Sequence, residues 1–225
     1  MTKLVIFDVD GTLIDSQAHI VTSLGAAFDA AGLSVPPRDT LLSIVGLSLP
    51  IAMAQLAPEA DAATLSRMIE AYKAEFYRVR MLEGAAASPL YDGAQAAIHA
   101  LMAREDIVLA IATGKSRRGL SALLEAWEFS AAFVSTQTAD DHPSKPHPAM
   151  VLECLLDTGI AAKDALVVGD TTFDIEMARA ANVASIGVSW GYHGAGALRE
   201  TQASKVISQF AELIPAIDDI FGDSA

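Results

Sequence analysis

Short apolar runs alternate with helical patterns along most of this chain, and no other feature constrains its fold as strongly. The first run is residues 3–7, and the pattern resumes near residue 88, with strands expected at 107–112, 133–135, 165–168 and 184–188. Strands that alternate with helices are joined by right-handed crossovers into a parallel sheet. We therefore expect an α/β fold with a doubly wound, Rossmann-like parallel-sheet core.

One long stretch interrupts this alternation. From residue 16 to about residue 83 every pattern is helical, with the later helices expected at 40–45, 49–56 and 62–81. Glycine and proline separate these helices, and no strand candidate lies between them. We expect residues 16–85 to form an inserted all-helical domain, and residues 1–15 and 86–225 to form the α/β core.

Two acids follow the first apolar run at once, in the segment Asp8-Val9-Asp10-Gly11-Thr12-Leu13. Residues i and i+2 of an extended segment point the same way, so both carboxylates should share the crevice at the carboxyl end of the strand. Gly11 lets the chain turn sharply there. A solvated Asp-Gly turn is the alternative interpretation.

Three later segments place polar groups at the same edge of the sheet. Thr113 and Gly114 follow the strand at 107–112 and offer a hydroxyl and an accessible backbone amide, which suit phosphoryl oxygens. Lys145 lies beside a proline that restricts the backbone, and Asp170 and Asp174 follow the strand at 165–168. Taken singly, these are also consistent with a capped turn, a solvated lysine and an acid at a helix N-terminus.

Taken together, the acids require a counter-charge. Asp8, Asp10, Asp170 and Asp174 would repel one another in one cleft unless a divalent cation and a lysine compensated them. Ligand sets made only of oxygen favour Mg²⁺. The sequence therefore predicts a magnesium site.

The order Asp-x-Asp-Gly-Thr-Leu, Thr-Gly, Lys-Pro and Gly-Asp-x-x-x-Asp resembles that of the haloacid dehalogenase superfamily of phosphohydrolases, over essentially the whole chain. The resemblance implies that the inserted domain, residues 16–85, is a cap domain on a catalytic core of residues 1–15 and 86–225. It also implies that Asp8 is the nucleophile and that Asp10 is the general acid and base. It implies that Thr113, Gly114 and Lys145 bind the phosphoryl group. It also implies that the carboxylate of Asp8, the backbone carbonyl of Asp10 and the carboxylate of Asp170 ligate magnesium, with Asp174 acting through a water.

Several reactions are known for this family, and the residues favour one of them. Asp10 favours phosphorus chemistry, because dehalogenases do not need a second acid at its position. The segment Gly46–Pro50 carries no charge, whereas related sugar-phosphate mutases tend to have a basic residue there. We expect a phosphoglycolate phosphatase-like enzyme that hydrolyses a small phosphorylated metabolite such as 2-phosphoglycolate. A β-phosphoglucomutase-like mutase, an inorganic pyrophosphatase and a non-catalytic binding protein stay open as alternatives.

The composition restricts the classes of partner that the chain is expected to bind. The net charge of −13 disfavours nucleic acid, and no apolar stretch reaches the length of a membrane span. We expect a cytoplasmic monomer or homodimer. The single Cys154 is expected in the core.

Other conspicuous residues are given structural interpretations. The five histidines share no metal-ligand spacing, and Arg117 and Arg118 are interpreted as a solvated helix face. Tyr72, Phe76 and Tyr77 are interpreted as packing among the cap helices or at a dimer surface. Residues 190–194, Trp-Gly-Tyr-His-Gly, are expected to pack at the edge of the core and to reach the cap.

Overall fold

A single parallel sheet forms the centre of the molecule. The computed structural model describes residues 2–222. The strands are β1 (Lys3–Phe7), β2 (Ile107–Thr113), β3 (Phe133–Thr138), β4 (Ala165–Gly169), β5 (Ala184–Val188) and β6 (Lys205–Ile207), in the order β3-β2-β1-β4-β5-β6. All neighbouring strands pair in parallel. The predicted doubly wound α/β fold is confirmed, and the strand order reverses between β1 and β4, where such sheets bind ligands.

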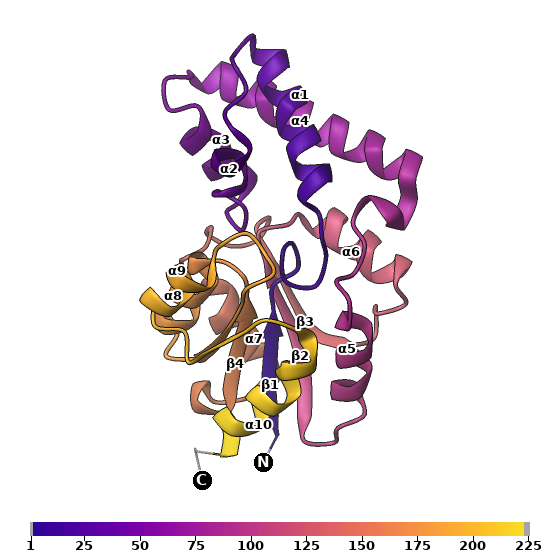
Figure 1. Ribbon diagram of the computed structural model, residues 1–225, viewed down its shortest axis with the longest axis vertical. Coiled ribbons are helices and arrows are strands. Elements are labelled where there is room, and N and C mark those ends of the chain that lie inside the picture. Colours follow the sequence, from indigo (N-terminus) through magenta and orange to yellow (C-terminus); the bar gives the residue numbers. More distant parts are fainter. Residues whose placement is uncertain (1, 223–225) are drawn as a thin grey trace.

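Helices cover both faces of this sheet (Figure 1). Val5 and Phe7 pack on one side with α5 (Ala94–Met102), α6 (Arg117–Ala126) and α10 (Leu213–Gly222). Leu4 and Ile6 pack on the other side with α7 (Ala149–Thr158) and α8 (Thr172–Ala180). Alternate residues of a strand point to opposite faces, so a continuous apolar run such as residues 3–7 suits a strand covered on both faces.

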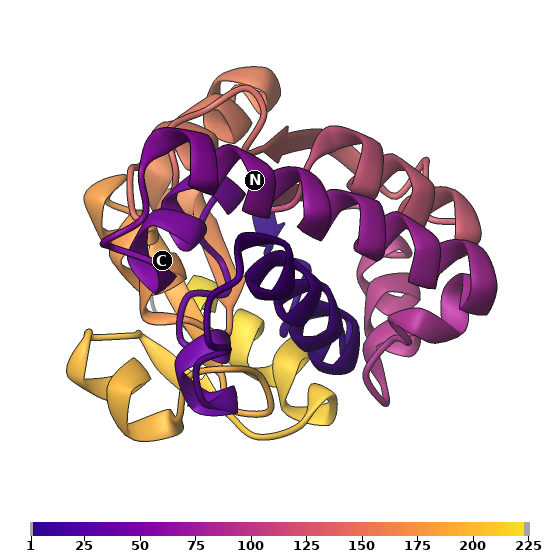
Figure 2. The same cartoon turned by 90° about the horizontal axis from the view of Figure 1, so that it is seen from above.

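The long helical stretch lies at the carboxyl edge of the sheet. It contains α1 (Gln17–Ala31), α2 (Arg38–Leu42), α3 (Leu49–Leu56) and α4 (Ala62–Glu83), and we call these helices and their connecting loops the cap. Figure 1 shows the cap above the core, and Figure 2 shows it from above, spread over that end of the core. The cap has its own apolar cluster, which includes Leu24, Phe28, Met53 and Met68. The domain boundaries at residues 15 and 86 stay a prediction.

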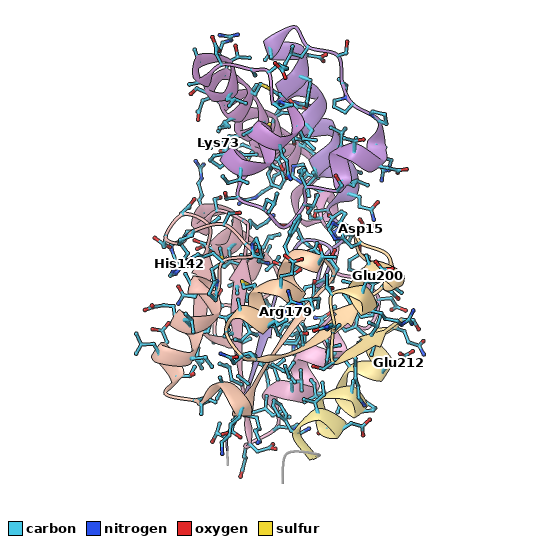
Figure 3. All side chains as sticks on the ribbon, turned by 90° about the vertical axis from the view of Figure 1, so that its left-hand side faces the viewer. Asp15, Lys73, His142, Arg179, Glu200 and Glu212 are labelled. Carbon is cyan, nitrogen blue, oxygen red and sulfur yellow. The ribbon has the colours of Figure 1, made fainter. Side chains whose placement is uncertain are left out.

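The two chain segments that join the cap to the core run side by side. The Asp15 N–H donates to the Pro89 carbonyl at 2.9 Å, and the Tyr91 N–H donates to the Leu13 carbonyl at 2.9 Å. Figure 3 shows Asp15 at this junction and Lys73 on the cap. The two covalent connections between the cap and the core are thus hydrogen-bonded to each other.

The structure contains elements beyond the predicted ones. They are α9 (Ala195–Glu200), β6 and α10, together with three short 3₁₀ helices at Gly84–Ala87, Ala162–Asp164 and Phe210–Glu212. The helix expected at 40–45 is found at Arg38–Leu42. Within residues 2–222 no helix is long and apolar enough to cross a membrane.

Candidate active site

Asp8 and Asp10 lie where β1 ends, beside β4. The Asp8 N–H donates to the carbonyl of Val168 at 2.9 Å, so the chain is still in register with β4 at this point. The next residues turn back sharply: the Gly11 N–H donates to the carbonyl of Ile14, and Gly11 has a φ of 85°. Such a φ favours glycine, which explains the residue type at the turn.

Lys145 is buried completely between two acids. Its side chain is 0% exposed, and its Nζ lies 2.8 Å from Asp8 Oδ1 and 2.6 Å from Asp174 Oδ1. Burial opposes the charge of Lys145, but Asp174 and Asp8 outweigh this effect and raise the pKa of its ammonium group. The lysine is therefore a fixed positive charge behind the carboxylate of Asp8.

Asp170 is held by groups from both ends of the chain. Its Oδ1 accepts from the Thr12 hydroxyl at 2.9 Å, and its Oδ2 accepts from the Tyr192 N–H at 2.8 Å. A Cβ on Gly11 or on Gly191 would lie 2.3 or 2.2 Å from Asp170 Oδ2, so both positions need glycine for this close approach. Burial, followed by the charges of Asp174 and Asp8, raises the pKa of Asp170 well above its usual value.

Asp174 caps the N-terminus of α8 and also belongs to the acidic cluster. Its Oδ2 accepts from the backbone N–H of Thr171 at 3.0 Å and from the Thr171 hydroxyl at 2.7 Å, which completes a capping box. Its Oδ1 accepts from Lys145. Both oxygens of Asp174 thus have protein partners.

These acids form a cluster that fits a hard cation. One carboxylate oxygen from each of Asp8, Asp170 and Asp174 lies within 4.8 Å of the others, and all three residues are buried. Within residues 2–222, Asp8 Oδ2 is buried without a hydrogen-bond partner. Burial raises the pKa of Asp8 to about 6, although Lys145 opposes the rise. A bound Mg²⁺ would neutralise this excess negative charge, and oxygen donors are its preferred ligands.

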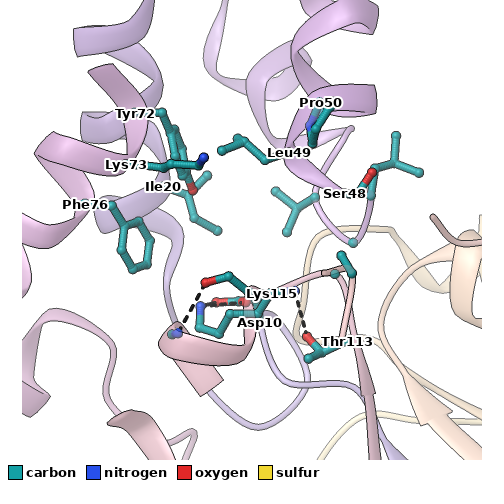
Figure 4. Close-up of a pocket in the computed structure, with 18 of the residues that line it drawn as sticks. Asp10, Ile20, Ser48, Leu49, Pro50, Tyr72, Lys73, Phe76, Thr113 and Lys115 are labelled. Atoms are coloured by element: carbon teal, nitrogen blue, oxygen red, sulfur yellow. Dashed lines mark hydrogen bonds and ion pairs between the residues drawn. The ribbon is translucent and has the colours of Figure 1, made fainter. Parts of the chain in front are cut away.

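Lys115 is a site residue that the sequence prediction missed. Its Nζ lies 2.9 and 2.8 Å from the two oxygens of Asp10, and its side chain is 8% exposed. Figure 4 shows this pair beneath the cap, where Lys115 also lies 5.0 Å from the ring centroid of Phe76. The position of Lys115, directly after Thr113-Gly114, was the signal that could have identified it. The pair fixes the direction of the Asp10 carboxylate.

Thr113 and Gly114 lie at the end of β2, under a loop of the cap. The Thr113 side chain is buried, and its Oγ1 accepts from the Lys115 N–H at 3.2 Å. A Cβ on Gly114 would lie 2.5 Å from the carbonyl oxygen of Gly46 and 2.9 Å from that of Leu47. The backbone of the cap loop therefore rests directly on Gly114. The Ser48 N–H also donates to the Ser144 hydroxyl of the core at 2.8 Å.

A cavity of about 630 Å³ lies between the cap and these strand ends. Asp8, Asp10, Thr113, Gly114 and Lys115 form its floor. The cap supplies most of the remaining lining, mainly from α1, α4 and residues 44–52, and the core adds Ser116, Arg118, Gly119, Ala139 and Asp140. Figure 4 shows Asp10, Thr113 and Lys115 facing Ile20, Leu49 and Tyr72 across this space. The structure thus brings the predicted residues together, with Lys145 behind Asp8 and not in the lining.

The interpretation of the aromatic residues needs correction. Tyr72 and Phe76 do pack against the apolar cluster of the cap, but together with Tyr77 they also line the cavity. Helical spacing marks an apolar face and does not distinguish a core from a cavity wall. Arg118 also lines the cavity and stacks on Tyr77, with 5.0 Å from its Cζ to the ring centroid, whereas Arg117 pairs with Asp141 at the surface.

Residues 190–194 contact both the core and the cap. Trp190 packs on Phe210 and donates to the Thr12 carbonyl at 3.0 Å, while the Tyr192 hydroxyl lies 2.8 Å from the Ser16 hydroxyl. Tyr192 packs against the apolar cluster of the cap. The expected packing at the core edge and contact with the cap are both present, and the backbone contact of Tyr192 with Asp170 was not foreseen.

Comparisons with known proteins find similar sequences and structures over nearly the whole chain. The family model described as haloacid dehalogenase-like hydrolase matches residues 5–188. A probable phosphatase, IndB, of Dickeya dadantii is 34% identical over 96% of this chain and 94% of its own length. A phosphoglycolate phosphatase of Agrobacterium fabrum is 32% identical over 96% and 93%. The crystal structure of a hydrolase from Pseudomonas syringae matches with a TM-score of 0.85 and 24% identity, covering 98% of this chain and 99% of that one.

Proposed function

This chain belongs to the haloacid dehalogenase-like hydrolases, and we propose that it is a magnesium-dependent phosphatase that hydrolyses a small phosphomonoester through an aspartyl-phosphate on Asp8. The observation that carries this proposal is the environment of Asp8. Its carboxylate lines the cavity, has one unpaired buried oxygen within residues 2–222, and is backed by the buried cation Lys145. We further propose that residues 16–85 act as a cap domain, and residues 1–15 and 86–225 as the catalytic core.

In the first step, a carboxylate oxygen of Asp8 attacks phosphorus and the bond from phosphorus to the ester oxygen breaks. Asp10 gives its proton to the departing alkoxide, which leaves as an alcohol. Thr113 and the Gly114 amide hold the phosphoryl oxygens, while Lys145 offsets the charge of Asp8. Phosphoryl transfer depends mainly on this positioning and charge compensation.

In the second step, Asp10 takes a proton from a water molecule, whose oxygen attacks phosphorus. The bond between Asp8 and phosphorus breaks, so that inorganic phosphate leaves and both carboxyl groups return to their starting states. Lys115 acts as a positioning residue here, because it holds both oxygens of Asp10 at the cavity floor.

The residues that would hold magnesium are Asp8 and Asp170 through their carboxylates, and Asp10 through its backbone carbonyl. When bound, the ion would supply positive charge to the phosphoryl group and to Asp8. Thr12 and the Tyr192 amide fix the carboxylate of Asp170 for this role.

Relatives named phosphoglycolate phosphatase make 2-phosphoglycolate the reference substrate. The mutase alternative requires polar cap groups that grip a sugar and keep water unproductive until the sugar binds. The loop Gly46–Pro50 offers Ser48 as its polar side chain. This composition favours hydrolysis over transfer to a sugar.

The covalent intermediate can be tested by letting methanol compete with water as the phosphoryl acceptor. Turnover of several phosphomonoesters in buffer with methanol should give the same ratio of methyl phosphate to inorganic phosphate for every ester, because a common Asp8-phosphate would partition between the two acceptors. Ratios that change with the leaving group would indicate direct attack by water. Asp8→Asn should abolish turnover, and Asp10→Asn should reduce it by ~10²–10⁴-fold.

A second assay separates hydrolysis from transfer. The enzyme is incubated with β-glucose 1-phosphate and a sugar bisphosphate primer. If glucose 6-phosphate formed faster than any ester released phosphate, the mutase function would replace the one proposed here.

A further inference from the structure

The size of the cavity bears on the leaving group. Pockets of roughly 300–1,000 Å³ take up drug-sized ligands, and this cavity measures about 630 Å³. A phosphoryl group above Asp8 with a two-carbon leaving group such as glycolate would leave most of that space to water. The volume therefore fits a leaving group considerably larger than glycolate.

The cap side of the cavity is mainly apolar. Ile20 and Leu24 of α1, Leu47 and Leu49 near the start of α3, and Phe76 of α4 all contribute to the lining. Placing a ligand with an apolar face against such a wall removes apolar surface from water on both partners. A small, strongly hydrated anion gains nothing from these side chains.

The polar groups of the cavity also suit a larger leaving group. Lys115, beside Asp10, is held by both Asp10 oxygens. The other cations of the lining are Lys73 and Arg80 of α4 and Arg118 of α6, and Figure 4 shows Lys73 on the cap side, across the cavity from Asp10. The Tyr72 hydroxyl lines the cavity without a hydrogen-bond partner in residues 2–222. Tyr72 is half-buried, and its hydroxyl can bind a polar atom of a ligand. Figure 4 shows Tyr72 on the cap side, across the cavity from Asp10.

We propose that the substrate is a phosphomonoester whose leaving group carries a ring with an apolar face, seated under α1, α3 and α4. This inference rests on the proposed phosphatase function and specifies its substrate class. It departs from the two-carbon ester that the uncharged loop Gly46–Pro50 led us to expect, because the walls contributed by α1 and α4 were not recognised from the sequence.

The test compares esters with closely similar chemistry. Benzyl phosphate, ethyl phosphate and 2-phosphoglycolate all release primary alcohols, so the difference in kcat/KM reports mainly on contacts with the leaving group. We expect kcat/KM for benzyl phosphate to exceed that for each of the other two by about tenfold or more, the scale on which apolar pockets discriminate.

A variant with a smaller cavity tests the same inference. Leu49→Trp enlarges a side chain of the lining and should lower kcat/KM for benzyl phosphate about tenfold, while the value for ethyl phosphate changes less than about twofold. Ile51→Trp is the control, because Ile51 lies on the same helix, is 51% exposed and does not line the cavity. It should leave both values unchanged.

The outcomes separate the two proposals. If 2-phosphoglycolate or ethyl phosphate were the better substrate of the wild-type enzyme, the ring-binding inference would be overturned while the phosphatase function stood. An equal loss for both esters in Leu49→Trp would also overturn it. If none of these esters nor p-nitrophenyl phosphate released phosphate with Mg²⁺, the proposed function itself would fail. The wild-type comparison holds even if Leu49→Trp does not fold.

Discussion

Gly114 offers a direct test of whether the observed contact between cap and core is the catalytic one. An added Cβ would lie 2.5 Å from the Gly46 carbonyl oxygen, whereas ordinary contacts begin near 3.4 Å. In Gly114→Ala the cap loop must therefore retreat by about 1 Å at this point, or the core strand must shift by the same amount. The backbone N–H proposed to bind phosphoryl oxygens is retained.

The size of the effect follows from the cost of overpacking. Forcing extra carbon into a well-packed contact costs about 1–3 kcal/mol, and each 1.4 kcal/mol corresponds to a factor of ten. If catalysis requires the cap loop in the position that the structure shows, kcat/KM should fall by roughly 5- to 150-fold. The melting temperature should change little, because the clash disappears when the cap opens.

The assay is steady-state kinetics with p-nitrophenyl phosphate, combined with thermal unfolding. Gly25→Ala is the control, since a Cβ on Gly25 of α1 would meet nothing within 4 Å, and it should leave kcat/KM unchanged. If Gly114→Ala kept full activity while its cap loop stayed in place, the contact would not limit catalysis and the reasoning would be wrong.

Three further predictions concern charge. Lys145→Met should cost about 3–5 kcal/mol in urea unfolding, because it leaves Asp8 and Asp174 without their buried cation; a cost below about 1 kcal/mol would contradict the buried ion pair. Chelation with EDTA should abolish activity and Mg²⁺ should restore it, and Asp170→Asn should raise the Mg²⁺ concentration needed for half-maximal activity. Asp174→Asn should mainly lower the melting temperature, because the N-terminal cap of α8 is lost. An unchanged melting temperature in Asp174→Asn would rule out this capping role. Burial lowers the pKa of His19 from its usual 6.5, so the unfolded chain binds more protons below that pH and this residue's contribution to stability is lost on acidification. The unfolding free energy of wild type minus that of His19→Gln should therefore fall from pH 7.5 to pH 5.5, and a constant difference would refute the assignment.

The core of the site could be predicted from the sequence because its residues lie at strand ends. Asp8, Thr113 and Asp170 each follow an apolar run, and parallel strands bring their carboxyl ends to one edge of the sheet. Strand periodicity and residue type were therefore sufficient to predict that these side chains lie close together. Their proposed roles came from the resemblance to a family and not from the periodicity.

Other parts depended on contacts that a linear pattern does not contain. The pairing of Lys115 with Asp10 joins positions far apart in sequence, and the seating of Asp170 against Tyr192 depends on glycines at 11 and 191. Tyr72 faces the cavity between the cap and the strand ends, and this cavity exists only once the cap lies over the core. The short strand β6 at Lys205–Ile207 has too few residues to produce a clear period.

The attachment of the cap through two paired segments, near Asp15 and Pro89, has a consequence for the evolution of selectivity. The groups proposed to act on phosphorus come from the core, whereas the surface available to the leaving group comes mainly from α1, α4 and residues 44–52. Substitutions in the cap can therefore alter which alcohol is released without moving a reacting atom. A library confined to Ile20, Leu49 and Tyr72 should yield variants that exchange one ester for another, while their rate on a minimal ester such as ethyl phosphate drifts little from that of the parent.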